Sequence, residues 1–191
     1  EKLPRSSASA LQRGLLAKLL ASPVLFKSLL QMSQALKVFL PEALSSKLPS
    51  RMPSIEPPQS ASIHKRKVLI LDGCVQDALA PNINLATKKV LSAFDIEWKS
   101  IRKASCCGSA SFHLDQVVSA KQQARTTIDA WWPLIETGEI EAVVINVSGC
   151  GLFVKEYVDL FSGDELYRSK AERIAALAKD PSEFLLKEDW S

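Results

Sequence analysis

The leucine-rich first part of this sequence, from Ala10 to Leu40, lacks a run that could span a membrane. Its longest stretch without a charged residue is Ser28–Leu36, whereas a membrane-spanning helix needs about 20 apolar residues. A formal net charge of +3 is too small to indicate a nucleic-acid partner, and the basic residues do not gather on one predicted face of the later part. The sequence also lacks a glycine-rich phosphate loop, a Ser-His-Asp set and an H-E-x-x-H motif.

Cysteine is scarce: the chain has four, namely Cys74, Cys106, Cys107 and Cys150, and no two of them form a C-x-x-C pair. Structural zinc sites usually take their ligands from such pairs, because a short loop wraps one tetrahedral ion. No secretion signal is recognisable, which predicts a reducing compartment, where unpaired cysteines commonly serve metals or catalysis. We therefore predict a cytoplasmic protein. Because the chain begins with Glu1, we also expect it to be part of a longer protein.

What the chain does have is a cysteine after each predicted strand. The continuous apolar, β-branched runs Val68–Leu71 and Ala142–Val147 predict strands buried on both faces, as in a parallel sheet, and each run leads to a Gly-Cys pair. A third predicted strand, Ile96–Ile101, leads into Cys106-Cys107-Gly108. The carboxyl ends of parallel strands meet at one edge of a sheet, where open α/β folds build their sites. We therefore expect the four sulfurs to lie together at that edge.

The predicted elements follow the order β-α-β-α-β-α, which implies right-handed crossovers, a small parallel sheet and flanking helices in an α/β fold. Apolar residues at helical spacing place these helices at residues 81–94, 115–136, 152–161 and 166–178. Five residues of the first helix should share its buried face: Ile83, Ala86, Val90, Ala93 and Phe94. Pro133 falls late in the second helix and could bend or end it. We expect the α/β domain over residues 65–180 and a tail over 181–191.

The segment before this domain, residues 1–64, is predicted to hold two short amphipathic helices and a proline-rich linker. The helices are expected at residues 11–21 and 23–40, with Pro23 opening the second, and the extended linker at Pro41–Gln59. Basic residues interrupt the leucines at regular intervals. The helices either pack on the main domain or on a neighbouring domain, or they form a basic surface that touches a membrane.

Four thiolates at one sheet edge suggest a soft metal, meaning zinc or an iron–sulfur cluster. The side chains of Cys106 and Cys107 point apart in an extended backbone, so they suit different metal atoms of one cluster better than a single ion. Glycines beside the cysteines would let the backbone approach such a cluster closely. The alternatives are four small buried hydrophobes, a zinc-bound or metal-free docking module, and thiol–disulfide exchange, which the strained ring between adjacent cysteines disfavours.

Seven further residues are weaker candidates: His64, Asp72, His113, Trp131, Trp132, Lys155 and Glu156. The histidine after the CCG motif could hydrogen-bond a cluster sulfur or cap the next helix, and the histidine in the linker should be solvated. The lysine and glutamate after the last cysteine could tune a cluster's potential or form a solvated face. The two tryptophans are expected in the core rather than in an electron path, and the aspartate receives no role.

A set of short motifs resembles a known family: Asp72-Gly73-Cys74-Val75-Gln76, Pro81-Asn82-Ile83-Asn84, Cys106-Cys107-Gly108, Asp129-Ala130-Trp131-Trp132-Pro133 and Ser148-Gly149-Cys150-Gly151 with Val154-Lys155-Glu156-Tyr157. With these motifs, the stretch from about Val68 to Ala178 looks like a CCG cysteine-rich domain, in detail that of the iron–sulfur subunits of bacterial glycolate oxidase (glycolate dehydrogenase). Lactate-utilisation proteins and subunits of anaerobic glycerol-3-phosphate dehydrogenase and of heterodisulfide reductase are related to this family. The preceding leucine-rich and proline-rich segment also suits such an iron–sulfur subunit.

The resemblance implies electron transfer. A partner subunit carrying FAD would oxidise glycolate to glyoxylate, and this chain, not itself catalytic, would relay electrons toward the quinone pool, with peripheral contact to the inner membrane. The resemblance also implies that Cys74, Cys106, Cys107 and Cys150 ligate a cluster of the 4Fe–4S type. The chain departs from the family in three respects: it lacks the ferredoxin-type C-x-x-C-x-x-C-x-x-x-C-P motifs and a second CCG repeat, and it has Cys150-Gly151-Leu152-Phe153 where some relatives have C-x-x-C.

Overall fold

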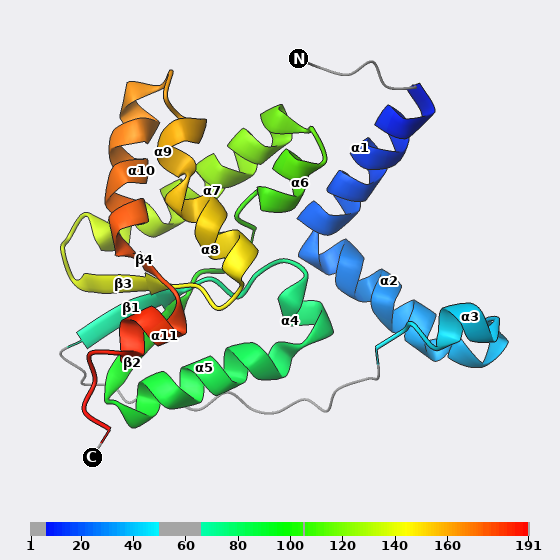
Figure 1. The fold of residues 1–191 in the computed structure, drawn as a ribbon, viewed down its shortest axis with the longest axis horizontal. Coiled ribbons are helices and arrows are strands. Elements are labelled where there is room, and N and C mark those ends of the chain that lie inside the picture. The colour runs from blue at the N-terminus through cyan, green and yellow to red at the C-terminus, as the bar shows by residue number, and fades with distance from the viewer. Residues whose placement is uncertain (1–6, 50–65, 105, 191) are drawn as a thin grey trace.

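The structure is a computed structural model that describes residues 7–49, 66–104 and 106–190 (Figure 1). His64, the expected domain start at residue 65 and most of the predicted proline-rich linker lie outside these described residues. The described part of that linker is not simply extended, because Glu42–Ser45 form the short helix α3. Pro41 directly precedes it, and a proline is well tolerated where a helix begins.

The centre of the fold is a four-stranded parallel sheet, with the order β2-β1-β3-β4. Its strands are β1 Arg66–Ile70, β2 Ile96–Ser100, β3 Ile140–Val144 and β4 Ala178–Lys179. The three longer strands confirm the predicted parallel sheet, although β3 begins and ends earlier than its apolar run. In the register, Ile70 pairs with both Ser100 and Val144. The carboxyl ends of β1, β2 and β3 are therefore level with one another.

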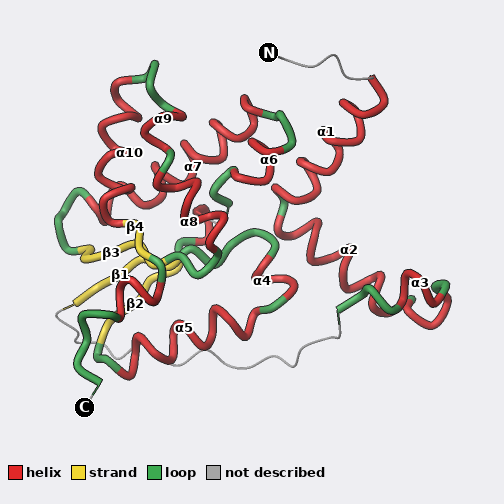
Figure 2. Tube along the Cα trace, in the orientation of Figure 1, coloured by secondary structure: helices red, strands yellow, loops and turns green. Residues whose placement is uncertain are grey.

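Helices cover both faces of the sheet (Figure 2), which explains why the later residues of β1 and β3 are apolar and buried. Leu69 and Leu71 point into the larger core, formed with α7 Val117–Ile135, α8 Ser148–Lys155, α9 Tyr157–Leu160 and α10 Glu165–Leu177. Val68 and Ile70 point to the opposite core, formed with α5 Pro81–Ala93 and α11 Pro181–Leu185. Figure 1 shows these two helical layers on either side of the strands.

Helix α5 lies where the sequence predicts it, but its buried face is different. Asn84 and Leu91 are its buried residues, whereas Ile83, Ala86 and Ala93 are exposed. The prediction of the buried face was wrong because it counted apolar residues alone. An asparagine becomes buried here since its side chain finds hydrogen-bond partners at the strand ends, and burial with partners costs little.

Three further helix boundaries differ from the prediction. Helix α7 starts at Val117, after a short helix α6 Ser109–His113, and it continues past Pro133 to Ile135. The predicted helix 152–161 is divided into α8 and α9 at Glu156. Helix α8 already begins at Ser148, so the last cysteine of the chain lies inside its first turn rather than in a loop before it.

Residues 180–190, which the sequence pattern left unplaced, pack onto the sheet. Asp180 and Glu183 form a capping box at the start of α11. Phe184 is buried in the second core, and the Trp190 ring meets Phe94 edge-on, with 4.8 Å between ring centroids. Arg66, at the start of β1, joins this segment to the sheet through an ion pair of 2.7 Å with Glu188.

The N-terminal helices α1 Ser7–Ala21 and α2 Pro23–Ala35 confirm that two helices precede the domain. Helix α1 begins before the predicted residue 11, and α2 ends before residue 40 because a separate 3-10 turn, Lys37–Phe39, follows it. Ser22 caps α2, accepting a hydrogen bond from the Leu25 amide at 3.4 Å. Helix α1 packs against α6, and α2 packs against α4 Gln76–Leu79. Within the described residues, no single helix is long and apolar enough to cross a membrane; Ser9–Ala21 and Pro23–Ala35 meet the length and composition test only as a pair, which is bent by 96°.

Candidate cysteine site

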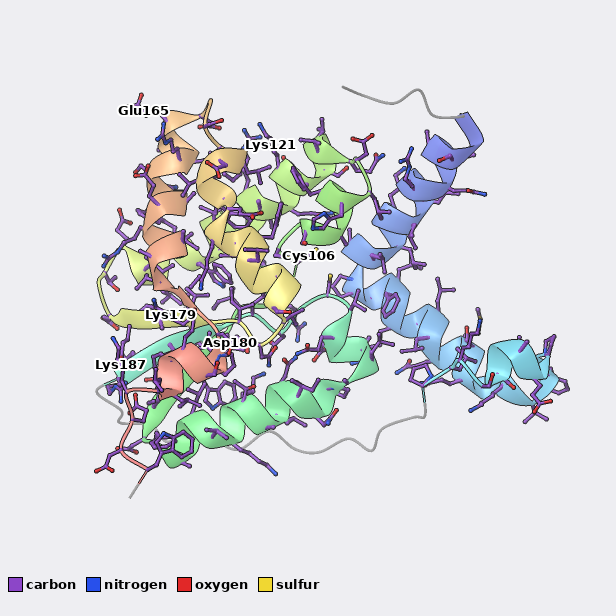
Figure 3. The ribbon with its side chains drawn as sticks, viewed as in Figure 1. Cys106, Lys121, Glu165, Lys179, Asp180 and Lys187 are labelled. Carbon is purple, nitrogen blue, oxygen red and sulfur yellow. The ribbon has the colours of Figure 1, made fainter. Side chains whose placement is uncertain are left out.

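The four cysteines come from three strand ends, as the sequence predicted. Cys74 follows β1, Cys106 and Cys107 follow β2, and Cys150 lies in the first turn of α8 after β3. All four are free thiols; the first three are buried and the last is half-buried. In Figure 3, Cys106 is labelled at the carboxyl edge of the sheet, near the start of α8 and the bend between α1 and α2.

The thiols lie as two neighbouring pairs, Cys74 with Cys106 and Cys107 with Cys150. The Cys106 hydrogen bond lowers the pKa of the Cys74 thiol to about 7, with help from the nearby backbone amides of Cys74 and Val75. The hydrogen bond to Cys74 raises the pKa of Cys106, and burial raises it further. The hydrogen bond to Cys150 and burial raise the pKa of Cys107 in the same way.

The ligand that this site could hold follows from its donor atoms, which are four cysteine sulfurs. The raised pKa values of Cys106 and Cys107 mean that these two buried thiols resist ionisation in the metal-free chain. Metal cations bind cysteine as the thiolate and remove this cost. Four cysteine sulfurs are the donor set of an iron–sulfur cluster. Among the residues that the structure describes, no three His, Cys, Asp or Glu side chains are grouped so that they could hold a metal ion.

Gly108 gives the CCG loop its shape. Its backbone lies in the left-handed region, with a φ of +94°, and a Cβ at this position would lie 2.8 Å from the carbonyl oxygen of Ala120 in α7. Only glycine fits both conditions. The turn places the amide of Ser109, at the start of α6, 3.5 Å from the Cys107 sulfur as a hydrogen-bond donor.

Three further side chains, which the sequence analysis did not single out, surround the CCG loop. Thr127 donates to the carbonyl oxygen of Cys106 at 2.9 Å, and Tyr157 donates to that of Cys107 at 2.6 Å. The amide oxygen of Gln123 accepts from the Cys106 thiol at 3.8 Å. Tyr157 belongs to one of the motifs that carry the family resemblance. Gln123 and Thr127 are one helical turn apart in α7, beside its apolar face, and this polar pair was the signal available in the sequence.

A network of amide side chains holds the loop of Cys74. The Asn84 side chain accepts hydrogen bonds from Gln76 and from Asn146, both at 3.0 Å. It donates in turn to the backbone carbonyl of Asp72 at 2.8 Å. The Asp72 carboxylate, which received no role from the sequence, forms an ion pair of 2.8 Å with Lys88. The network therefore links the loops after β1 and β3 to α5, next to the candidate site.

The remaining candidate residues from the sequence analysis lie on the exposed surface or in the larger core. His113 ends α6 with an exposed side chain that meets the Phe112 ring edge-on. Lys155 is paired with Glu183 of α11 at 3.0 Å on the exposed surface, and Glu156 is exposed between α8 and α9. The two tryptophans confirm the prediction of a packing role. Trp131 is fully buried in the larger core, and Trp132 packs beside it.

Known proteins resemble this chain in the region that contains the four cysteines. Residues 68–155 match the family model described as CCG, cysteine-rich domain. The chain is 39% identical over 188 residues to the glycolate oxidase iron-sulfur subunit of Escherichia coli K12, covering 98% of this chain and 46% of that protein. It is 28% identical over 161 residues to the probable glycolate oxidase iron-sulfur subunit of Bacillus subtilis, covering 82% of this chain and 34% of that protein.

Lactate utilization protein A of Geobacillus thermodenitrificans is 25% identical over 120 residues, which are 63% of this chain and 48% of that protein. The chain thus spans less than half the length of each of these relatives. No solved structure gives a significant match. Free cysteines therefore follow three level strand ends, residues 68–155 match the CCG cysteine-rich domain model, and nearly the whole chain is similar to part of a glycolate oxidase iron–sulfur subunit.

Proposed function

We propose that this chain is the cluster-binding part of an electron-transfer subunit of a glycolate oxidase complex. The observation that carries the proposal is the delivery of four free thiols, after three parallel strands, to one edge of the sheet. Cys74, Cys106, Cys107 and Cys150 would be the ligands of an iron–sulfur cluster of the 4Fe–4S type. Such a cluster supplies one-electron transfer when it is bound.

The chain's own residues would hold and shield that cluster. The apolar core on one side and the packing of α6 and α8 on the other limit the access of water, which helps to set a cluster's potential. A partner subunit with FAD would oxidise glycolate to glyoxylate, and the electrons would pass through this chain toward the quinone pool. Related lactate-utilising complexes are the nearest variant of this proposal, because lactate and glycolate are both 2-hydroxy acids.

Anaerobic reconstitution with iron and sulfide tests the cluster. We expect stoichiometric iron and acid-labile sulfide in the wild-type chain, and loss of both when any of the four cysteines is replaced by serine. Thr126→Val, an exposed change on α7, is the matched control and should retain the cluster. Stoichiometric zinc without acid-labile sulfide would contradict the proposal and support a zinc-bound docking module instead.

The helices α1 and α2 are proposed to make the peripheral contact with the cytoplasmic face of the inner membrane. Large apolar side chains are exposed along them and the turn that follows: Leu11, Leu15, Val24, Met32, Val38 and Phe39. From residue 7 to residue 41 the segment carries four basic residues and no acidic one, which favours an anionic bilayer. Membrane fractions should release the protein in high salt or carbonate. Extraction by detergent alone would contradict this contact.

We also propose that residues 1–64 are separable from the CCG domain. Deleting residues 1–60 should improve solubility, because an exposed apolar surface is removed, while cluster incorporation is retained. Iron and sulfide content of the shortened chain, measured beside the full chain, checks this. Loss of the cluster on deletion would show that the cover of α1 over α6 is required.

A further inference from the structure

The peptide units of the CCG loop are held by hydroxyl groups from two different helices. Thr127 of α7 donates to the carbonyl oxygen of Cys106 at 2.9 Å, and Tyr157 of α9 donates to that of Cys107 at 2.6 Å. Both side chains are buried, with exposed fractions of 1% and 0%. A buried carbonyl group needs a partner, so each hydroxyl fixes the orientation of one peptide plane.

The orientation of these carbonyls decides where the neighbouring amides point. The C=O and N–H of a trans peptide point in opposite directions. The carbonyl of Cys107 and the amide of Gly108 belong to one peptide unit, and Tyr157 holds this unit through its carbonyl. The next amide, that of Ser109, donates to the sulfur of Cys107. A tyrosine that holds the Cys107 carbonyl therefore fixes the peptide unit next to the amide that bonds the Cys107 sulfur.

The tyrosine is well suited to hold one position. Its ring lies edge-on to Phe153 and to Phe161, with ring centroids 5.6 and 6.3 Å away, so the ring cannot turn freely. Burial raises the pKa of Tyr157, with the nearby thiols of Cys107 and Cys106 adding to the effect, so its hydroxyl stays a donor at all ordinary pH values.

We propose that Tyr157 and Thr127 are positioning residues, which hold the CCG loop so that the Ser109 amide faces the sulfur of Cys107. The proposal rests on the proposed cluster function and goes beyond it by assigning two residues that set the cluster's properties. Hydrogen bonds to cysteine sulfurs stabilise the reduced, more negative state of a cluster and raise its reduction potential. Removing either hydroxyl frees a peptide unit to rotate and lowers that potential.

The first experiment compares Tyr157→Phe with Tyr167→Phe. The control removes the only other tyrosine hydroxyl of the chain, which donates to Asp129 at 2.9 Å on the exposed surface. Thr127→Val and Thr126→Val form a second pair, because the Thr126 hydroxyl bonds only within its own exposed helix surface, to Gln122 at 3.0 Å. After reconstitution, redox titration followed by EPR should give a lower potential for both buried-site variants. Potentials equal to those of the two controls would overturn the proposal.

A second measurement needs no cluster. In the metal-free chain, mass spectrometry can follow the reaction of each cysteine with iodoacetamide. Tyr157→Phe should slow the modification of Cys107 roughly tenfold relative to Cys74 in the same molecule, because the reacting thiolate loses the amide hydrogen bond that stabilises it. Equal relative rates in Tyr157→Phe and Tyr167→Phe would overturn the proposal. A wild-type chain that takes up no iron would instead sink the proposed function, and the alkylation rates would still decide the positioning role.

Discussion

Replacing Gly108 by alanine tests the shape of the CCG loop, and the structure allows the two parts of its cost to be separated. A φ of +94° is unfavourable for any residue with a Cβ, which costs roughly 1–2 kcal/mol. The new Cβ would also lie 2.8 Å from the Ala120 carbonyl oxygen. That oxygen is part of the α7 backbone, so the overlap cannot be relieved by a rotamer change and adds about 1–3 kcal/mol.

Gly138→Ala is the matched control for this prediction. Gly138 also has a positive φ, of +76°, but no atom lies within 4 Å of the position that a Cβ would take there. The control should therefore lose only the conformational part, roughly 1–2 kcal/mol, whereas Gly108→Ala should lose about 2–5 kcal/mol in total. Urea unfolding followed by circular dichroism measures both free energies of unfolding. Equal losses in the two variants would refute the close approach of the CCG loop to α7.

Three further predictions concern the surroundings of the site. Asn84→Leu should cost about 2–4 kcal/mol of unfolding free energy, because its buried partners lose their hydrogen bonds. Asn82→Leu, on the exposed side of α5, should cost little. Equal costs in urea unfolding would contradict the network. Since the pKa of Cys74 is lowered to about 7, its alkylation rate in the metal-free chain should rise with pH to a half-maximum near pH 7, and a midpoint above pH 8 by mass spectrometry would contradict the pairing with Cys106. Arg66→Met should lower the free energy of unfolding by about 1 kcal/mol at pH 7, a value reduced for solvent exposure. Because Arg66 lowers the pKa of Glu188 below 4.5, this contribution is present above pH 4.5 and should disappear as the pH falls through the lowered pKa. A cost that persists in acid would argue against the ion pair.

The parts of the fold that repeat a pattern could be predicted from the sequence. The apolar runs of β1 and β3 indicate strands covered on both faces, and the parallel order then brings their carboxyl ends together, with the cysteines that follow them. Strand β4 could not be predicted, because two residues carry no periodicity. It forms because Ala178 leaves α10 beside the free edge of β3, to which it pairs at Val143.

The polar side chains around the site were the harder part. A polar residue in a helix is expected to face water, so Asn84 and Thr127 were not expected among the buried residues. Their burial depends on partners that are distant in the sequence, namely the loop after β1 and the CCG loop. The same is true of the start of α8. Its first turn is set by the end of β3, and this placement moves Cys150 from a loop onto a helix.

The order of the strands also has a consequence for synthesis on the ribosome. Strand β1 is made first but stands between β2 and β3 in the sheet. Its partner β3 begins at Ile140, about 70 residues after β1 ends at Ile70, which is roughly 4–14 s of translation at 5–20 residues per second. Throughout that interval one side of an apolar strand has no partner, and such edges favour aggregation. The last cysteine emerges later still, so the four thiols cannot meet at the edge of the sheet until β3 and the start of α8 have been made.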